Sequence, residues 1–188
     1  MTARAIARAV LVAVGLAVVG VGAGLVLVLA VLVAVEAAGV ALTPVRTIAV
    51  SLVFATGLGF GGVAVVYLRT RDLPVAYVGI ARPSWGDALA VGAGYLSALL
   101  LVAAAGAVLM RTDTEAAPNT AAQAGLADPS VLVLLMVASL VIIGPGEELL
   151  FRGIVQRRLR EALPAVAAIP LASIIFAAIH YLSLAGAP

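Results

Sequence analysis

Long apolar runs separated by short polar stretches dominate this chain of 188 residues. A helix needs about 20 apolar residues to cross the roughly 30 Å hydrocarbon core of a bilayer. Three runs reach this length without a charged residue, namely residues 9–35, 48–68 and 88–110. Each of them predicts a transmembrane helix.

Two further apolar stretches lie in the last third of the chain. Residues 131–143 are too few to cross alone, so the predicted span continues through charged sequence to residue 154. A fifth span is predicted near residues 165–184, which include His180, the single histidine. We therefore expect an all-α fold, a polytopic transmembrane helical bundle of about five spans forming one membrane-embedded domain over residues 1–188.

Composition agrees with a membrane protein. The chain is 64% hydrophobic and 11% charged, whereas a soluble domain is about 45–50% apolar and about 25% charged. A formal net charge of +2 gives no reason to expect a nucleic-acid partner, so the expected surroundings are the lipid bilayer. The absence of cysteine excludes disulfides, a thiol nucleophile and thiolate metal ligands.

The basic residues, all of them arginine, predict the orientation of the spans. Loops on the cytoplasmic side of a membrane carry an excess of basic residues. The loops on the side of the N-terminus hold most of the arginines, and the loops on the other side hold two. We expect a multi-pass protein of the cell membrane with a cytoplasmic N-terminus. The arginines on that side are Arg4, Arg8, Arg69, Arg71, Arg82, Arg157, Arg158 and Arg160.

Glycines in the first two spans are interpreted as helix contacts. Residues 57–62, GLGFGG, formally match a dinucleotide-binding pattern, but that pattern requires a preceding strand and a following helix. Small residues at four-residue spacing instead allow transmembrane helices to approach closely. We expect this role for Gly20 with Gly24 and for Gly57 with Gly61. The polar residues 111–129 are expected to form a solvated connection.

The sequence GPGEELLFRG, residues 144–153, places charges inside the fourth span. Its Gly-Pro-Gly start is expected to break or kink the helix, so that a new helix begins at Pro145 with both carboxylates in its first turn. Glu148 and Arg152 are spaced to form an i,i+4 ion pair, which we expect to be buried. Glu147 points about 100° away from Glu148 around the helix and is left for another role.

Glu147 is the candidate general base. We take Arg157 as the cytosolic edge of the span. Glu147 precedes Arg157 by ten residues, or about 15 Å of helix, which places Glu147 near the middle of the bilayer. Ionisable residues at that depth normally face a polar interior and indicate a functional site. A desolvated carboxylate holds a proton more tightly, as a base near neutral pH requires, and a nearby His180 could relay the proton. Alternatively, His180 is a hydrogen-bonded core residue.

These residues carry a resemblance to a known family. EELLFR, Glu147–Arg152, is similar to an E-E-x-x-x-R motif, and FAAIH, Phe176–His180, to an F-x-x-x-H motif. Both are motifs of the CPBP family, which comprises type II CAAX prenyl endopeptidases and their bacteriocin-processing and abortive-infection relatives. The resemblance covers residues 77–184 and implies the core of an all-helical intramembrane protease.

The resemblance implies roles for six residues. Glu147 would activate the attacking water with help from His180, and Glu148 with Arg152 would hold the site together. Phe151 and Phe176 would contact the substrate, a peptide or protein at the membrane. A catalytic zinc usually takes three protein ligands, and the chain has one histidine, so zinc is disfavoured and no cofactor is expected.

Family members carry a further histidine on a later span, and this sequence ends at Pro188 before such a motif. We therefore expect activity to need a missing C-terminal segment or a second subunit. Two alternatives stay open. The chain could be a catalytically inactive relative that acts as a membrane scaffold or immunity protein. Less favoured is a proton-coupled transporter that uses Glu147 and His180 as a relay.

Overall fold

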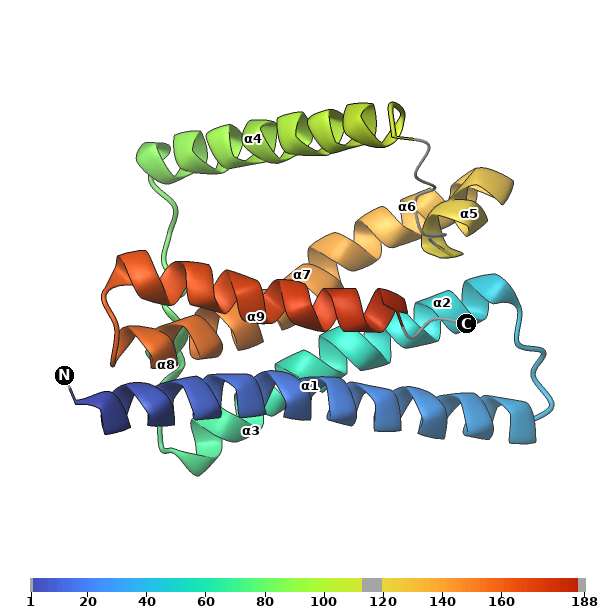
Figure 1. Cartoon of the computed structure of the whole chain (residues 1–188). Coiled ribbons are helices and arrows are strands. Elements are labelled where there is room, and N and C mark those ends of the chain that lie inside the picture. Colours follow the sequence, from blue (N-terminus) through green and yellow to red (C-terminus); the bar gives the residue numbers. More distant parts are fainter. Residues whose placement is uncertain (1, 113–119, 186–188) are drawn as a thin grey trace. The chain divides into compact units, whose positions relative to one another are not determined.

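The structure, a computed structural model, describes residues 2–112 and 120–185 (Figure 1). Helices make up 85% of it, and no strand occurs in these two ranges, which confirms the predicted all-α class. Two compact units are distinguished. One contains residues 1–79 and 121–188, and the other contains residues 80–120.

The larger unit holds three long helical stretches. The first is α1 (Ala3–Ala37). The second runs through α2 (Pro44–Ser51), the π-helical segment η1 (Leu52–Phe60) and α3 (Gly61–Thr70), followed by the short 3₁₀ turn η2 (Val75–Val78). After α5 (Thr120–Ala127), the third stretch consists of α6 (Pro129–Ala138), η3 (Ser139–Ile143), α7 (Gly144–Glu147), η4 (Glu148–Val155) and α8 (Gln156–Arg160).

Two further helices complete the fold. α9 (Ala165–Ala185) belongs to the larger unit, where it contacts α1, η4 and α8. Figure 1 shows it in red, alongside α8. The smaller unit is essentially α4 (Trp85–Leu109), whose first turn is closed by a capping box between Ser84 and Asp87.

Four helices are long and apolar enough to cross a membrane: Ala3–Ala37, Pro44–Thr70, Trp85–Leu109 and Pro129–Arg160. Each of them contains or overlaps one of the first four predicted spans, and the fourth extends well beyond the uncharged residues 131–143. α9 is a shorter apolar helix at the position of the predicted fifth span. The expected connection over residues 111–129 is not wholly irregular, because α5 lies within it.

Glycines set how closely the three stretches of the larger unit pack. A Cβ added to Gly24 would lie 2.6 Å from the carbonyl oxygen of Ala55, and one added to Gly20 would lie 2.7 Å from Leu150. Both glycines, together with Gly57, confirm the predicted close approach. Gly61 does not, since its added Cβ would meet its nearest neighbour at 3.8 Å, an ordinary contact distance.

The helix from Pro129 to Arg160 continues through the Gly-Pro-Gly sequence. Of the expected break or kink at this point, the break with a new helix at Pro145 is therefore wrong. Proline lacks an N–H group, and in a regular α-helix its ring collides with the carbonyl four residues earlier. The π-helical segment η3 ends two residues before Pro145 and widens the helix there, a common accommodation of such strain. Glu147 and Glu148 thus lie inside a continuous helix, without a helix N-terminus to offset their charge.

The core of the larger unit forms where η4 and α8 meet α1, α3 and α9. Leu150, Ile154 and Leu159 are fully buried in it. They pack against small residues of α1 and α9 such as Ala13 and Ala168, which are also fully buried. Since η4 carries both the core residues and the charged motif, this packing fixes the direction in which each carboxylate points.

Candidate active site

Glu147 lies where the third helical stretch crosses the second. The preceding residue, Gly146, is buried, and a Cβ added to it would lie 2.5 Å from the carbonyl oxygen of Thr56 and 3.1 Å from the Cα of Gly57. Because a hydrogen is the largest side chain that fits here, the two backbones touch directly. This contact holds the Glu147 carboxylate, whose side chain is 19% exposed, against η1.

His180 of α9 lies next to Glu147 of α7. Its Nε2 atom lies 3.6 Å from Oε1 of Glu147, and its Nδ1 atom lies 3.0 Å from the carbonyl oxygen of Phe176. A carbonyl only accepts, so Nδ1 is the protonated donor of this hydrogen bond. Nε2 is then the nitrogen directed at the carboxylate. The separation of 3.6 Å is slightly longer than a direct hydrogen bond.

Glu148 and Arg152 form the expected ion pair, with Arg152 Nε 2.7 Å from Glu148 Oε2. The expectation that the pair is buried is wrong. The side chain of Arg152 is 71% exposed and that of Glu148 is 59% exposed. The reason is the helical turn: the face of η4 that carries Leu150, Phe151 and Ile154 packs into the core, which directs Glu148 and Arg152 outward.

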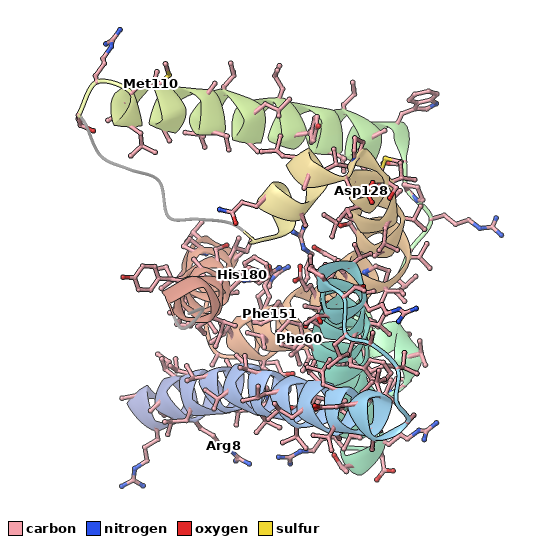
Figure 2. The ribbon with its side chains drawn as sticks, turned by 90° about the vertical axis from the view of Figure 1, so that its right-hand side faces the viewer. Arg8, Phe60, Met110, Asp128, Phe151 and His180 are labelled. Carbon is pink, nitrogen blue, oxygen red and sulfur yellow. The ribbon has the colours of Figure 1, made fainter. Side chains whose placement is uncertain are left out.

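A chain of aromatic rings leads from η1 to His180. The ring of Phe151 makes edge-to-face contacts with Phe60, at a centroid distance of 5.3 Å, and with Phe176, at 5.0 Å. The ring of Phe176 lies 4.0 Å from the imidazole of His180. Figure 2 shows Phe60, Phe151 and His180 following one another in this order. Phe151 is 6% exposed, so its main contacts are with the core.

Glu147 borders two cavities. One, of about 150 Å³, also touches Glu148, Phe151, Arg152 and Phe176, so it brings five of the six predicted site residues to one place. The second, of about 410 Å³, contains Glu147 and His180 together with residues of α1, α2, η1 and α9. Glu147 is the residue that the two cavities share.

The second cavity includes residues that the sequence analysis did not single out. Its wall is largely apolar, with Val21 and Leu25 from α1 and Phe60 from η1, and it includes the hydroxyl-bearing Ser51 and Thr56. Hydroxyl side chains inside an otherwise apolar span were a weak signal in the sequence. Thr56 donates its hydroxyl to the carbonyl of Leu52 at 2.6 Å, so it also serves the backbone of η1.

Among the described residues, few side chains at this site could ligate a metal ion. Within the described part of the chain, no three His, Cys, Asp or Glu side chains gather closely enough to hold a metal ion. Glu147 and His180 supply two donors, and the neighbouring carboxylate of Glu148 is paired with Arg152. A zinc site with one open position needs three protein ligands.

Residues 129–187 match one protein-family model, Rce1-like, which describes type II CAAX prenyl endopeptidases. The match contains the motifs at Glu147–Arg152 and Phe176–His180, and it is consistent with a CPBP family protein, as the resemblance predicted. A search of curated proteins gave no match, and a search of solved structures gave none. The family match and the four long apolar helices support a CAAX-protease-like membrane protein.

Proposed function

We propose that this protein is an intramembrane endopeptidase that hydrolyses a peptide bond with a water molecule activated by Glu147. The observation that carries the proposal is the placement of Glu147, which lies 3.6 Å from His180 and borders both cavities. A carboxylate with an imidazole beside it can accept and return a proton during one reaction cycle.

In the proposed reaction, a water molecule lies between the Glu147 carboxylate and the carbonyl carbon of the scissile bond. Glu147 accepts one proton as the water oxygen bonds to that carbon, which gives a tetrahedral intermediate. The intermediate then collapses, the C–N bond breaks, and the proton held at Glu147 passes to the leaving nitrogen. The products are a carboxylic acid and an amine, which exchange a proton to give a carboxylate and an ammonium group, and Glu147 regains its starting state.

His180 assists in this scheme because its orientation is fixed. The hydrogen bond from Nδ1 to the Phe176 carbonyl holds the ring and directs Nε2 towards Glu147. Nε2 can therefore accept a hydrogen bond from the water, or share the proton that Glu147 takes up. Phe176 stacks on the same ring and limits its rotation.

Glu148 and Arg152 act in positioning. Their charges offset one another at 2.7 Å, so the only carboxylate left to react with water at this point of the helix is Glu147. Both side chains border the cavity of about 150 Å³, which is smaller than the roughly 300–1,000 Å³ of typical ligand pockets. That space suits a water and the atoms of one peptide group, with Phe176 as the apolar contact.

We also propose a location in the cell membrane with the N-terminus in the cytoplasm. Within the larger unit, Arg8 of α1, Arg71 after α3 and Arg158 of α8 border one cavity, so these basic helix ends lie together. An excess of arginine favours the cytoplasmic side. The substrate is then a peptide or protein that reaches Glu147 at the membrane.

The test is cleavage of a CAAX-type peptide by the purified chain in liposomes. We expect Glu147→Gln to lower the rate about 10²–10⁴-fold, the usual contribution of a general acid–base group, and to leave thermal stability unchanged. Glu36→Gln, an equal charge change at the exposed end of α1, is the matched control. Cleavage that persists in Glu147→Gln contradicts the proposal. A folded wild-type chain that cleaves nothing agrees with the expectation that activity needs a further segment or a second subunit, and also with the inactive-relative alternative.

A further inference from the structure

A third cavity lies at the opposite end of the helices from the loop between α1 and α2. It measures about 460 Å³ and is bordered by Arg8, Arg71 and Arg158, by Tyr67 and Tyr77, and by Glu161. These residues belong to α1, α3, η2 and α8 or to the turns that follow them. None of them takes part in the reaction proposed above.

The cavity has a positive lining. It holds three guanidinium groups and one carboxylate, so 3 − 1 gives a net charge of +2. The carboxylate of Glu161 accepts hydrogen bonds from the hydroxyl of Tyr77, at 2.6 Å, and from Arg158. Burial and this hydrogen bond raise the pKa of Tyr77, so the phenol keeps its proton and adds no negative charge.

Arg158 has bonding capacity that the protein does not use. Its Nη1 atom pairs with Glu161, but its Nε atom is buried and has no hydrogen-bond partner among the described residues. A buried donor that lacks an acceptor is costly, and the cost is greater for a charged group. The Arg158 side chain also borders the cavity, so an anion there would lie beside a guanidinium group that Glu161 pairs through Nη1.

The position of the cavity indicates what kind of anion. Arg8 lies in the second turn of α1, Arg71 follows the last residue of α3, and Arg158 lies near the end of α8, so all three mark ends of membrane-spanning helices. Figure 2 labels Arg8 on α1. Helix ends lie at the level of lipid headgroups, and basic pockets between such helices recognise anionic headgroups. Guanidinium groups also bind phosphate oxygens in pairs.

We propose that this cavity binds the phosphate headgroup of an anionic phospholipid. Arg8, Arg71 and Arg158 contact the phosphate from three helices, and Tyr77 and Glu161 fix the position of Arg158. The small apolar residues that also border the cavity, Ala5, Ala9 and Ala162, leave room for the glycerol part of the lipid. The lipid would hold the N-terminus of α1 against the end of α8.

The experiment titrates the purified full chain in detergent with phosphatidylglycerol or phosphatidylcholine and counts bound lipid by native mass spectrometry. We expect tighter binding of phosphatidylglycerol. Arg71→Gln and Arg158→Gln should each weaken it about fivefold, the contribution of one basic residue near an anionic membrane surface. Arg69→Gln and Arg160→Gln remove the same charge from residues outside the cavity and should change it less than twofold.

Three results would overturn the proposal. Equal binding of the two lipids would show that no anion is recognised. Equal losses in Arg71→Gln and Arg69→Gln would show a diffuse charge effect. Inorganic phosphate that binds as tightly as phosphatidylglycerol would assign the cavity to a soluble anion. Because Arg158→Gln also loses the contact with Glu161, its melting temperature is recorded, and Arg71→Gln decides the outcome if Arg158→Gln unfolds.

Discussion

Glu147 and Glu148 are neighbours in the sequence, yet the structure gives them opposite surroundings. The Glu147 side chain is 19% exposed and lies beside His180, whereas the Glu148 side chain is 59% exposed and pairs with Arg152. One residue along a helix turns a side chain by about 100°. That turn is enough to direct one carboxylate into the bundle and the other away from it.

The comparison extends to the two faces of the helix that carries them. The inward face begins at Glu147 and continues with Leu150, Phe151 and Ile154. These last three residues are buried. The outward face holds Glu148 and Arg152. The difference teaches that packing decides which carboxylate lies beside His180, while the ion pair with Arg152 occupies the other one. If so, substitutions on the inward face should affect stability far more than substitutions on the outward face.

The largest effect is expected for Phe151→Ala. Phe151 is 6% exposed and touches both Phe60 and Phe176, so its loss leaves a cavity between η1 and α9. Such truncations cost about 3–5 kcal/mol, which denaturant unfolding in detergent can measure. Leu140→Ala is the control, because Leu140 belongs to the same continuous helix and is 74% exposed. Similar losses in the two variants would contradict the assignment of an inward face.

A smaller loss is expected for Gly146→Ala. The new Cβ would lie 2.5 Å from the Thr56 carbonyl oxygen, which is backbone and cannot turn aside. Overpacking of this kind costs about 1–3 kcal/mol, and it should also displace Glu147 from His180. Gly15→Ala is the matched control, since nothing lies within 4 Å of an added Cβ there. If both variants melt at the wild-type temperature, the close contact between Gly146 and Thr56 does not limit the stability of the protein.

Much of this architecture could be predicted from the sequence. Uncharged runs gave the spans, since only a helix satisfies its own backbone in lipid. The spacing of Glu148 and Arg152 predicted their ion pair, and the charged motif with His180 predicted the residues that meet in the candidate site. These inferences depend on local spacing, which the sequence displays directly.

The rest depends on contacts between distant segments. Pro145 indicated a break, but η3 accommodates it within one helix. The exposure of the Glu148–Arg152 pair follows from which face of η4 packs against α1 and α9, and a single sequence does not state that face. Thr56 borders the cavity with Glu147 because Gly57 and Gly146 let two helices touch, a contact between residues nearly ninety positions apart.

The smallest effect is expected for Arg152→Ala. A buried pair would leave an uncompensated charge and cost about 3–5 kcal/mol when one partner is removed. The observed pair is exposed, and exposed ion pairs contribute about 0–1 kcal/mol.

Arg152→Ala should therefore lower the free energy of unfolding in detergent no more than Arg157→Ala, which removes an exposed guanidinium from the next helical turns. Its loss should also be several times smaller than that of Phe151→Ala. Arg157 lies over the ring of Tyr77 at 4.8 Å and so gives up one modest contact of its own. If Arg152→Ala unfolds the protein as readily as Phe151→Ala does, the outward face is covered in the membrane-embedded protein, and the contrast between the two carboxylates no longer rests on burial.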